Sequence, residues 1–504
     1  MNGFVAPSVG GQLDVLLPYL VVAVGGLAIM LVDALVRTRR RDHLPFLTLL
    51  VLLGSVLAQL ARSGGEEREI LAGMMTVGDY ARYFNLLFAG CGVLTTVFAG
   101  AVLERDGRGR PEFYPLLLFS ILGMMVLAAA SDLLTVFLGI ETMSLAVYVL
   151  AGGVRGDVRS SEAGFKYLLL GGFASAFLLM GMALLYGFAG GTAFSDIAGA
   201  LAAREGDLGL AMLGGGLVLV GFAFKVAIVP FHMWTPDVYD GAPAYVTGFM
   251  ATAVKAAGFA ILVRFAWLMQ PQLAFVWYPV LAGLAVVTMT VGNLVALAQS
   301  SVKRLLAWSS IAHAGYLMLG VVTLISPATG GSAQMVLGRE VGESAGSALL
   351  FYLLAYSLMN LAAFGIVASL GSREGEADDI ERYAGLSRRR PVAAAVLAVA
   401  MLSLAGIPPL VGFMSKFYLF SAVVRAGLVP LAVIGVINSL ISVYYYLRLL
   451  VVMYMKKPEA DGYAGHEPLA VGAAAVLAGL VLLLGVVPDG VHRAALVVFR
   501  QMSF

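Results

Sequence analysis

Cysteine and charged residues are both scarce in this chain. Cys91 is the only cysteine among 504 residues, so the chain holds no internal disulfide and no iron–sulfur or zinc site built from cysteines. Only 12% of the residues are charged and 60% are hydrophobic, whereas the apolar share of a soluble domain is about 45–50%. The composition therefore excludes a soluble globular protein.

Basic stretches of the kind that bind nucleic acid or direct export are absent as well. The formal net charge is only +2, and no basic stripe with interleaved aromatic residues occurs, so no nucleic-acid partner is expected. The first 20 residues contain neither lysine nor arginine. The first apolar run is therefore predicted to be a retained helix and not a cleaved signal peptide.

Long apolar runs, by contrast, recur from Leu16 to the C-terminus. About fourteen runs of about 20 residues leave almost no chain for a soluble domain. An all-α integral membrane protein, folded as one multi-pass helical bundle in the lipid bilayer, is predicted. The predicted spans are 14–36, 44–62, 80–103, 113–130, 132–152, 162–187, 209–231, 243–269, 273–298, 303–324, 345–370, 393–424, 429–453 and 469–487.

Basic residues gather in alternate loops between these spans, whereas the loops at 64–70 and 204–207 are acidic or carry few basic residues. The positive-inside rule places the basic loops in the cytoplasm. With an even number of helices, both termini are predicted on the outer side. The basic residues are Arg37, Arg39, Arg40, Arg41, Arg105, Arg108, Arg110, Arg155, Arg159, Lys303, Arg304, Arg388, Arg389, Arg390, Lys456 and Lys457.

Two predicted helices, 209–231 and 393–424, are interrupted by proline in similar ways. In each, a lysine lies within a few residues of the interruption. The two helices lie five apart in the order of spans, so they run in opposite directions, which is typical of an inverted repeat with its site near the midplane of the membrane. The predicted breaks are at Pro230 in the first helix and at Gly406, Pro408 and Pro409 in the second.

Three lysines lie at membrane depth in these apolar runs, namely Lys225, Lys255 and Lys416. A lysine at a helix centre costs roughly 2.5–3.5 kcal/mol. Pro230 cannot donate a hydrogen bond to the carbonyl of Val226, so the helix should open beside Lys225, and a freed carbonyl in a membrane requires a hydrated or protein-lined site. Each lysine is predicted to line a hydrated path. The alternative for Lys225 is a side chain that snorkels to the membrane interface, and for Lys255 and Lys416 it is a fixed pairing with a neighbouring helix.

One carboxylate lies at a similar depth. Glu141 is near the middle of the predicted span 132–152, and Ser144 and Tyr148 follow it at helical spacing. One face of an otherwise apolar helix is therefore polar. The simpler interpretation is a structural ion pair or an interhelical hydrogen bond, but buried carboxylates in membranes usually serve a function.

Two histidines are candidate members of a proton path. His313 lies in the stretch SSIAHAGY and His232 follows Pro230 by two residues. A single histidine in a helix is more often a hydrogen-bonded core residue than a proton relay. Neither histidine has a metal-ligand partner three or four residues away, so no metal site is predicted.

Other motifs are interpreted as structural. The stretch SSVK ending at Lys303 matches an acyl-enzyme pattern but starts a helix and lacks a second motif. Clustered glycines at 214–216 lie inside an apolar helix, where they allow close packing, and no strand precedes them. Asp132 and the acidic run 374–381 are expected to face solvent or a partner subunit.

A buried carboxylate and a buried lysine can together switch a proton. Burial lowers the pKa of a lysine by several units, and a carboxylate within about 4–6 Å raises it again. A swing of about three units corresponds to ~4 kcal/mol, which matches roughly 170 mV of membrane potential for one charge. Approach and withdrawal of Glu141 would thus load and release a proton at Lys225. The chain has no redox site, so a partner must drive the switch.

Six stretches carry a close resemblance to a known family, subunit N of respiratory complex I, the proton-pumping NADH:quinone oxidoreductase. They are FLGIETMSLAVYVLAG, EAGFKYLLLGGFASAFLLMGMALLYG, FKVAIVPFHMWTPDVYDGAPAYVT, ATAVKAAGFA, SSVKRLLAWSSIAHAGYLMLG and AGIPPLVGFMSKF, and they extend over the fifth to the twelfth span. One departure is Tyr245, which stands where a second proline is expected.

The resemblance implies an antiporter-like fold of fourteen helices with discontinuous helices 7 and 12. The expected regions are helices 1–3 at 1–112, a first inverted five-helix repeat at 113–270, a second at 271–455, and the last helix and tail at 456–504. It also implies that Glu141, Lys225, Lys255 and Lys416 are the functional residues of helices 5, 7, 8 and 12. Ser144 and the string KRLLAWSSIAHAGY favour subunit N over subunits M and L.

The resemblance further implies the setting of the chain. It is expected in a bacterial inner (plasma) membrane, beside other antiporter-like and small membrane subunits of complex I. NAD, FMN, iron–sulfur clusters and quinone are expected in partner subunits and none in this chain.

Two other functions fit the same residues. One is a subunit of a multi-chain Na+/H+ antiporter or of a membrane-bound hydrogenase, which share the fold. The other is a structural scaffold whose ion pairs only fix helix packing. The first differs in its partners, and the second predicts that loss of Lys225 leaves proton pumping intact.

Overall fold

The computed structural model describes residues 12–36, 43–62, 67–106, 110–203, 208–326, 335–372, 375–458, 463 and 467–502. Several residues used in the sequence predictions lie outside the described residues. They are Arg37, Arg39, Arg40, Arg41, Arg108, Glu374 and the stretches 64–66 and 204–207.

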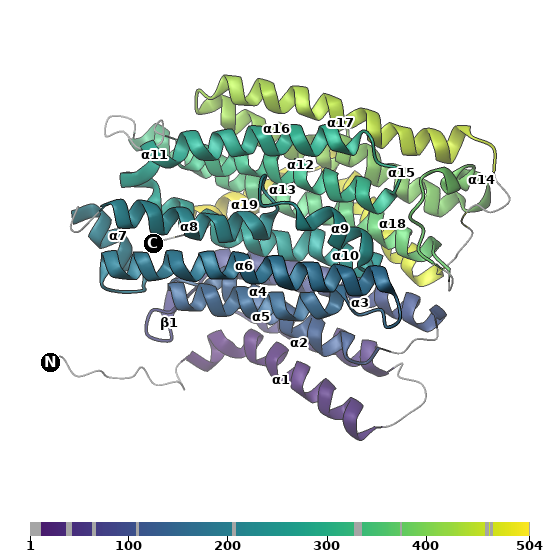
Figure 1. Cartoon of the computed structure of the whole chain (residues 1–504), viewed down its shortest axis with the longest axis horizontal. Coiled ribbons are helices and arrows are strands. Elements are labelled where there is room, and N and C mark those ends of the chain that lie inside the picture. The colour runs from purple at the N-terminus through teal and green to yellow at the C-terminus, as the bar shows by residue number, and fades with distance from the viewer. Residues whose placement is uncertain are drawn as a thin grey trace.

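The described chain is a bundle of long helices that run side by side along the long axis of the molecule (Figure 1). The predicted all-α membrane fold is confirmed. The helices are α1 Leu13–Leu35, α2 His43–Ala61, α3 Asp79–Asp106, α4 Phe113–Ala129, α5 Leu133–Ala151, α6 Val158–Ala189, α7 Phe194–Ala203, α8 Leu208–Val226, α9 Trp234–Gly241, α10 Ala244–Phe249, α11 Lys255–Ala296, α12 Val302–Leu324, α13 Met335–Leu370, α14 Leu386–Arg389, α15 Pro391–Ala405, α16 Val411–Arg425, α17 Val429–Met455, α18 Pro468–Val486 and α19 Asp489–Arg500.

Within the described residues, twelve stretches are long and apolar enough to cross a membrane, and α11 contributes to two of them. The chain is thus an integral, multi-pass membrane protein. The remaining two predicted spans correspond to α4, which has 17 residues, and to α15 and α16, which have 15 each. The count of fourteen crossings and the division into two inverted repeats stay predictions.

The centre of the bundle is formed by the segment 244–268 and by α12. The most apolar window of the first is entirely buried and that of α12 is 94% buried, whereas the corresponding values for α1 and α2 are 33% and 28%. The outer helices present apolar side chains to the surroundings, as expected in lipid. Any polar group on the central segments must therefore find its partner inside the protein.

Both predicted helix breaks are confirmed. Helix α8 ends at Val226, where Pro230 withholds its hydrogen bond, so the predicted span 209–231 was too long. Ala227 then adopts a left-handed φ of 62° and the Ile228 amide donates to the Ala223 carbonyl at 2.9 Å. A seven-residue interval separates α8 from α9.

The second break divides the predicted span 393–424. Helix α15 ends at Ala405, and α16 begins at Val411. Gly406 adopts a left-handed φ of 86°, a conformation that glycine enters without strain, and the Ile407 amide donates to the Leu402 carbonyl at 3.1 Å. The two breaks therefore use the same backbone hydrogen-bond pattern.

Several elements were not predicted from the sequence. Helices α7, α9 and α19 are short, and the strands β1 Arg68–Ile70 and β2 Met75–Val77 pair antiparallel in the register Arg68 to Val77. The hairpin packs over the end of α4, where the Ser131 amide donates to the Met74 carbonyl at 3.2 Å. Three-residue strands and 8- to 12-residue helices carry too little periodic signal to be recognised.

Two expectations about acidic residues were wrong. Asp132 does not face solvent: it is buried and caps α5, accepting hydrogen bonds from the Leu134 amide at 2.7 Å and the Thr192 hydroxyl at 2.6 Å. The acidic run also folds back in part, since Glu376 pairs with the buried Lys303 at 2.5 Å. The cap formed by Asp132 is a local signal that an aspartate before an apolar helix can give, whereas the pairing of Glu376 with Lys303 joins distant parts of the chain.

The departure from the family pattern at Tyr245 does not displace the helix. Helix α10 begins at Ala244, directly after Pro243. Tyr245 is buried and packs edge-on against Phe113, with ring centroids 5.4 Å apart. An aromatic side chain thus occupies the position where the family pattern has proline.

Candidate functional site

The three lysines singled out from the sequence are all buried. The exposed fraction is 4% for Lys225 on α8, 2% for Lys255 at the start of α11 and 5% for Lys416 on α16. Among the described residues, no carboxylate forms an ion pair with any of the three. Each amine is instead held by neutral oxygen atoms. A proton on these amines is therefore not fixed by a permanent countercharge.

Lys225 contacts the polar face of α5. Its Nζ lies 2.7 Å from Ser144 Oγ and 3.1 Å from the Tyr148 hydroxyl. Ser144 in turn donates to the carbonyl of Ile140. The Tyr148 ring lies over Gly171 of α6, where any side chain would collide with the hydroxyl. Gly171 thus provides the space that lets Tyr148 reach the lysine.

Glu141 is one helical turn from Ser144 but is directed elsewhere. Its carboxylate accepts a hydrogen bond from the Ser175 hydroxyl on α6, and the residue is half-buried at the edge of the bundle. It forms no ion pair with Lys225 among the described residues. The two partners of the predicted switch, Glu141 on α5 and Lys225 on α8, therefore contact different residues in this structure.

Lys255 follows a π-helical turn at Met250–Val254. Its Nζ lies 2.6 Å from the carbonyl oxygen and 2.5 Å from the hydroxyl oxygen of Ser310 on α12. The helices of Lys225 and Lys255 are in direct contact, because a Cβ atom on Gly258 would lie 2.7 Å from Val226 Cγ1 and 3.6 Å from Lys225 Cβ. A π-helical turn such as Met250–Val254 often occurs at a functional site.

His313 lies one turn further along the same face of α12. Its Nδ1 is 2.8 Å from the Tyr352 hydroxyl on α13, and its Nε2 is 3.3 Å from the Tyr446 hydroxyl on α17. Tyr446 also hydrogen-bonds Ser309. His313 therefore belongs to a chain of exchangeable protons, whereas His232 lies in the first break, half-buried and edge-on against Trp308.

Lys416 reaches back across the second break. Its Nζ lies 3.1 Å from the carbonyl oxygens of both Leu404 and Ala405, and 2.8 Å from Ser439 Oγ. The amine also lies over the Tyr316 ring, 5.2 Å from the centroid. Lys416 thus caps the end of α15 with a positive charge, where a helix dipole favours a cation.

The polar face of α12 connects Lys255 with Lys416, because Ser310 contacts the first amine and Tyr316 the second. Ser310, His313 and Tyr316 recur at three-residue spacing on this fully buried helix. Tyr316 continues the network to Asn293, whose amide nitrogen lies 3.0 Å from the Tyr316 hydroxyl. The sequence prediction included His313 but missed its neighbours. Their helical spacing within SSIAHAGY was the available signal. The additional members of the network are Ser309, Ser310, Tyr316, Asn293, Tyr352, Tyr445, Tyr446, Asn438 and Ser439.

Within the described residues, no group of three or more His, Cys, Asp and Glu side chains is placed to hold a metal ion. The buried polar groups that do cluster are amines, hydroxyls, amides and one imidazole. The amines, the hydroxyls and the imidazole can exchange a proton with a neighbour, and the amides form hydrogen bonds to them.

The chain matches a family of membrane proteins described as "NADH:quinone oxidoreductase/Mrp antiporter, TM" over residues 130–442. Two relatives illustrate the likeness across nearly the whole length. NADH-quinone oxidoreductase subunit N of Trichlorobacter lovleyi is 41% identical over 488 residues and covers 96% of each chain. The protein of the same name from Myxococcus xanthus is 41% identical over 494 residues and covers 94% of each chain.

Solved structures agree with this. A chain of respiratory complex I from Thermus thermophilus is 36% identical, with a TM-score of 0.78, covering 94% of this chain and 98% of that one. A chain of the Mrp complex from Dietzia sp. DQ12-45-1b shares the fold at 21% identity, with a TM-score of 0.82, covering 96% and 97%. From its matched length and its identity to these relatives, the chain belongs to the NADH-quinone oxidoreductase subunit N family.

Proposed function

We propose that this chain is a proton-translocating subunit of an NADH:quinone oxidoreductase in a bacterial inner membrane. The relatives that cover nearly the whole chain are named as subunits of that enzyme. NAD, FMN, iron–sulfur clusters and quinone would be held by partner subunits. Other antiporter-like and small membrane subunits would be its direct neighbours.

The proposed path consists of Glu141, Lys225, Lys255 and Lys416, with Ser144, Tyr148 and His313 as relays and His232 at the first break. The observation that supports it most strongly is the absence of a fixed countercharge beside the three buried lysines among the described residues. A purely structural lysine at this depth would be paired, because an unpaired charge in a low-dielectric interior is costly.

In this proposal Glu141 controls whether Lys225 carries a proton. While its carboxylate is bound to Ser175 at the edge of the bundle, Lys225 is held only by hydroxyl groups. A partner subunit that draws Glu141 toward Lys225 would stabilise the protonated amine, and its return would release the proton. A free-energy change of ~4 kcal/mol at this pair is enough to move one charge against roughly 170 mV.

The two helix breaks are the proposed points of proton uptake and release. Each exposes backbone carbonyls next to a lysine, and a helix opening inside a membrane is tolerated where water or protein satisfies the carbonyl. Uptake from the cytoplasm and release to the outer side follow from the predicted placement of the basic loops, which also puts both termini outside.

The decisive experiment is Lys225→Ala in the fully assembled enzyme, reconstituted in vesicles. The proposal predicts a lower proton-to-electron ratio, measured by quenching of a pH-sensitive dye against the rate of NADH oxidation. A full ratio in this variant would support the scaffold alternative. Co-purification with flavin and iron–sulfur subunits separates the proposal from the Na+/H+ antiporter and hydrogenase alternatives.

A further inference from the structure

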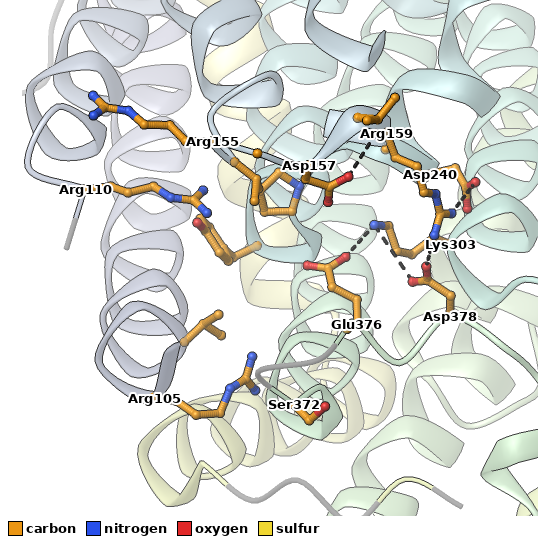
Figure 2. Close-up of a pocket in the computed structure, with 18 residues that line it drawn as sticks. Arg105, Arg110, Arg155, Asp157, Arg159, Asp240, Lys303, Ser372, Glu376 and Asp378 are labelled. Carbon is orange, nitrogen blue, oxygen red and sulfur yellow. Dashed lines mark hydrogen bonds and ion pairs between the residues drawn. The ribbon is translucent and has the colours of Figure 1, made fainter. Parts of the chain in front are cut away.

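A cavity of about 590 Å³ opens at the end of the bundle where α3, the α5–α6 loop, α10 and α12 meet. Figure 2 shows its side chains. The positive-inside rule predicts that this end of the bundle is the cytoplasmic one. Five cations line it, namely Arg105, Arg110, Arg155, Arg159 and Lys303. None of them belongs to the proposed proton path.

On one wall of the cavity, the cationic side chains are paired with carboxylates. Lys303 Nζ lies 2.5 Å from a Glu376 carboxylate oxygen, and Arg159 lies 2.8 Å from Asp240 and 3.2 Å from Asp378. These ion pairs connect α6, α12 and the 375–378 segment. Three carboxylates face two cations on this wall, so it does not attract an anionic ligand.

The opposite wall carries the remaining arginines. In Figure 2 the side chains of Arg105 and Arg110 point toward the cavity, whereas that of Arg155 points away from it. Arg105 donates to the carbonyls of Ala368 and Gly371 at 3.1 and 2.9 Å, and its Nε lies 4.0 Å from a Glu467 carboxylate oxygen. Arg155 has a side chain that is 89% exposed and pairs with Glu112 at 3.2 Å. Among the described residues, Arg110 has no carboxylate partner.

The nearest acidic side chain between the walls is already engaged. Asp157 caps α6, and its carboxylate accepts hydrogen bonds from the Arg159 amide at 2.8 Å and the Ser160 amide at 3.4 Å. Apolar side chains complete the lining, among them Val102, Val154, Pro243 and Tyr245. The cavity thus combines an arginine wall with an apolar surface.

We propose that this cavity binds a phosphate group, held by Arg110 together with Arg105. The planar guanidinium group matches phosphate oxygens through two parallel hydrogen bonds, and basic pockets between helices on the cytoplasmic side suit anionic headgroups. The phosphate comes either from the headgroup of an anionic phospholipid or from a free phosphate ion. The apolar lining would contact the glycerol part of a lipid.

The test uses the full-length chain in nanodiscs of phosphatidylcholine, with and without phosphatidylglycerol. Native mass spectrometry measures retained phosphatidylglycerol, and thermal unfolding in phosphatidylcholine nanodiscs is followed as inorganic phosphate is added. The variant is Arg110→Gln. Arg388→Gln is the matched control, because Arg388 is exposed, lies on the same predicted face and does not line the cavity.

Arg110→Gln is expected to weaken binding of the effective probe by about tenfold, the loss typical of one charge-assisted contact, and Arg388→Gln is expected to change nothing. An effect with phosphatidylglycerol alone identifies a lipid headgroup, and one with inorganic phosphate alone identifies a free ion. If Arg110→Gln does not fold, Arg110→Lys takes its place, because lysine keeps the charge but cannot form the two parallel hydrogen bonds. The proposal is overturned if neither probe binds the unaltered chain, or if the variant and the control behave alike.

Discussion

The two broken helices share a backbone pattern and differ in how their lysine uses it. Each break places one residue in the left-handed region and satisfies a carbonyl five residues back. Lys225 precedes its break and points away from it, toward hydroxyl groups of α5. Lys416 follows its break and reaches back to the two terminal carbonyls of α15.

At the first break a different group caps a carbonyl, and a separate hydrogen bond holds a backbone amide. The Trp234 indole donates to the Phe224 carbonyl at 3.0 Å, and the Val229 amide donates to the Thr288 hydroxyl at 3.1 Å. These donors do not titrate. The first break is therefore held whether or not Lys225 carries a proton, whereas the second break depends on an amine that the proposed function requires to change its charge.

This difference indicates two roles for the lysines. Lys225 exchanges a proton without loosening its helix, while Lys416 couples its proton to the end of α15. A charged amine stabilises a helix C-terminus more than a neutral one does. Loss of the proton from Lys416 would thus favour opening of the second break.

The largest effect is expected on the unfolding temperature when each lysine is replaced by alanine, and it distinguishes the two roles. Lys416→Ala removes the donor from two buried carbonyls, and each unsatisfied group costs about 1–3 kcal/mol. Lys225→Ala leaves hydroxyl groups that can rotate toward other acceptors. Lys416→Ala should therefore lower the unfolding temperature of the purified enzyme clearly more than Lys225→Ala does, while both reduce proton pumping.

Lys416→Arg is the control for this experiment. Arginine retains a cap for the carbonyls but stays charged at all working pH values, so it should restore the unfolding temperature without restoring pumping. Equal destabilisation by the two alanine variants would contradict the distinction.

The next largest effect is expected on proton pumping, from a substitution beside Lys225. Gly171→Ala places a methyl group where the Tyr148 hydroxyl lies, so Tyr148 must withdraw from Lys225. Loss of one hydrogen bond to a charged group corresponds to about a tenfold change, and the pumping rate should fall by about that factor. Gly172→Ala is the matched control, because a Cβ atom at Gly172 meets nothing within 4 Å. Equal rates in the two variants would show that Tyr148 has no part in the path.

A smaller effect is expected in the second region from His313→Gln. Glutamine cannot hold the Tyr352 and Tyr446 hydroxyls at the two ring positions of histidine, so proton passage from Ser310 toward Lys416 should slow several-fold, with a loss of about 1 kcal/mol per neutral hydrogen bond. Pumping and unfolding are measured together. Unfolding that shifts without any change in pumping would assign His313 a structural role only.

The smallest effect is expected from single substitutions at the two left-handed positions, Ala227 and Gly406. Ala227 has a φ of 62°, which costs a non-glycine residue roughly 1–2 kcal/mol, so Ala227→Gly should raise stability slightly and leave pumping unchanged. Gly406→Ala should lower it, because a Cβ atom there would lie 3.0 Å from Lys416 Cδ. Calorimetric unfolding of the two variants provides the comparison, and opposite shifts are expected.

Much of the fold was predictable because a bilayer imposes local rules. Apolar runs of fixed length mark the spans, and the prolines mark both breaks, since a missing amide hydrogen ends a helix whatever surrounds it. The short helices, the hairpin and the folding back of Glu376 were missed. The short helices and the hairpin carry too little periodic signal, and the contact between Glu376 and Lys303 joins residues far apart in the chain.

The sequence by itself determined that three amines and one carboxylate lie within long apolar runs, because composition and run length are read directly from the residues. Only the tertiary structure decided what each one meets. Lys225 finds Ser144 across 81 residues of chain and Lys255 finds Ser310 across 55, while Glu141 turns to Ser175 instead of to Lys225. A side chain's partner depends on which helices pack together, and helices that are apolar on all sides carry no sequence signal for that choice.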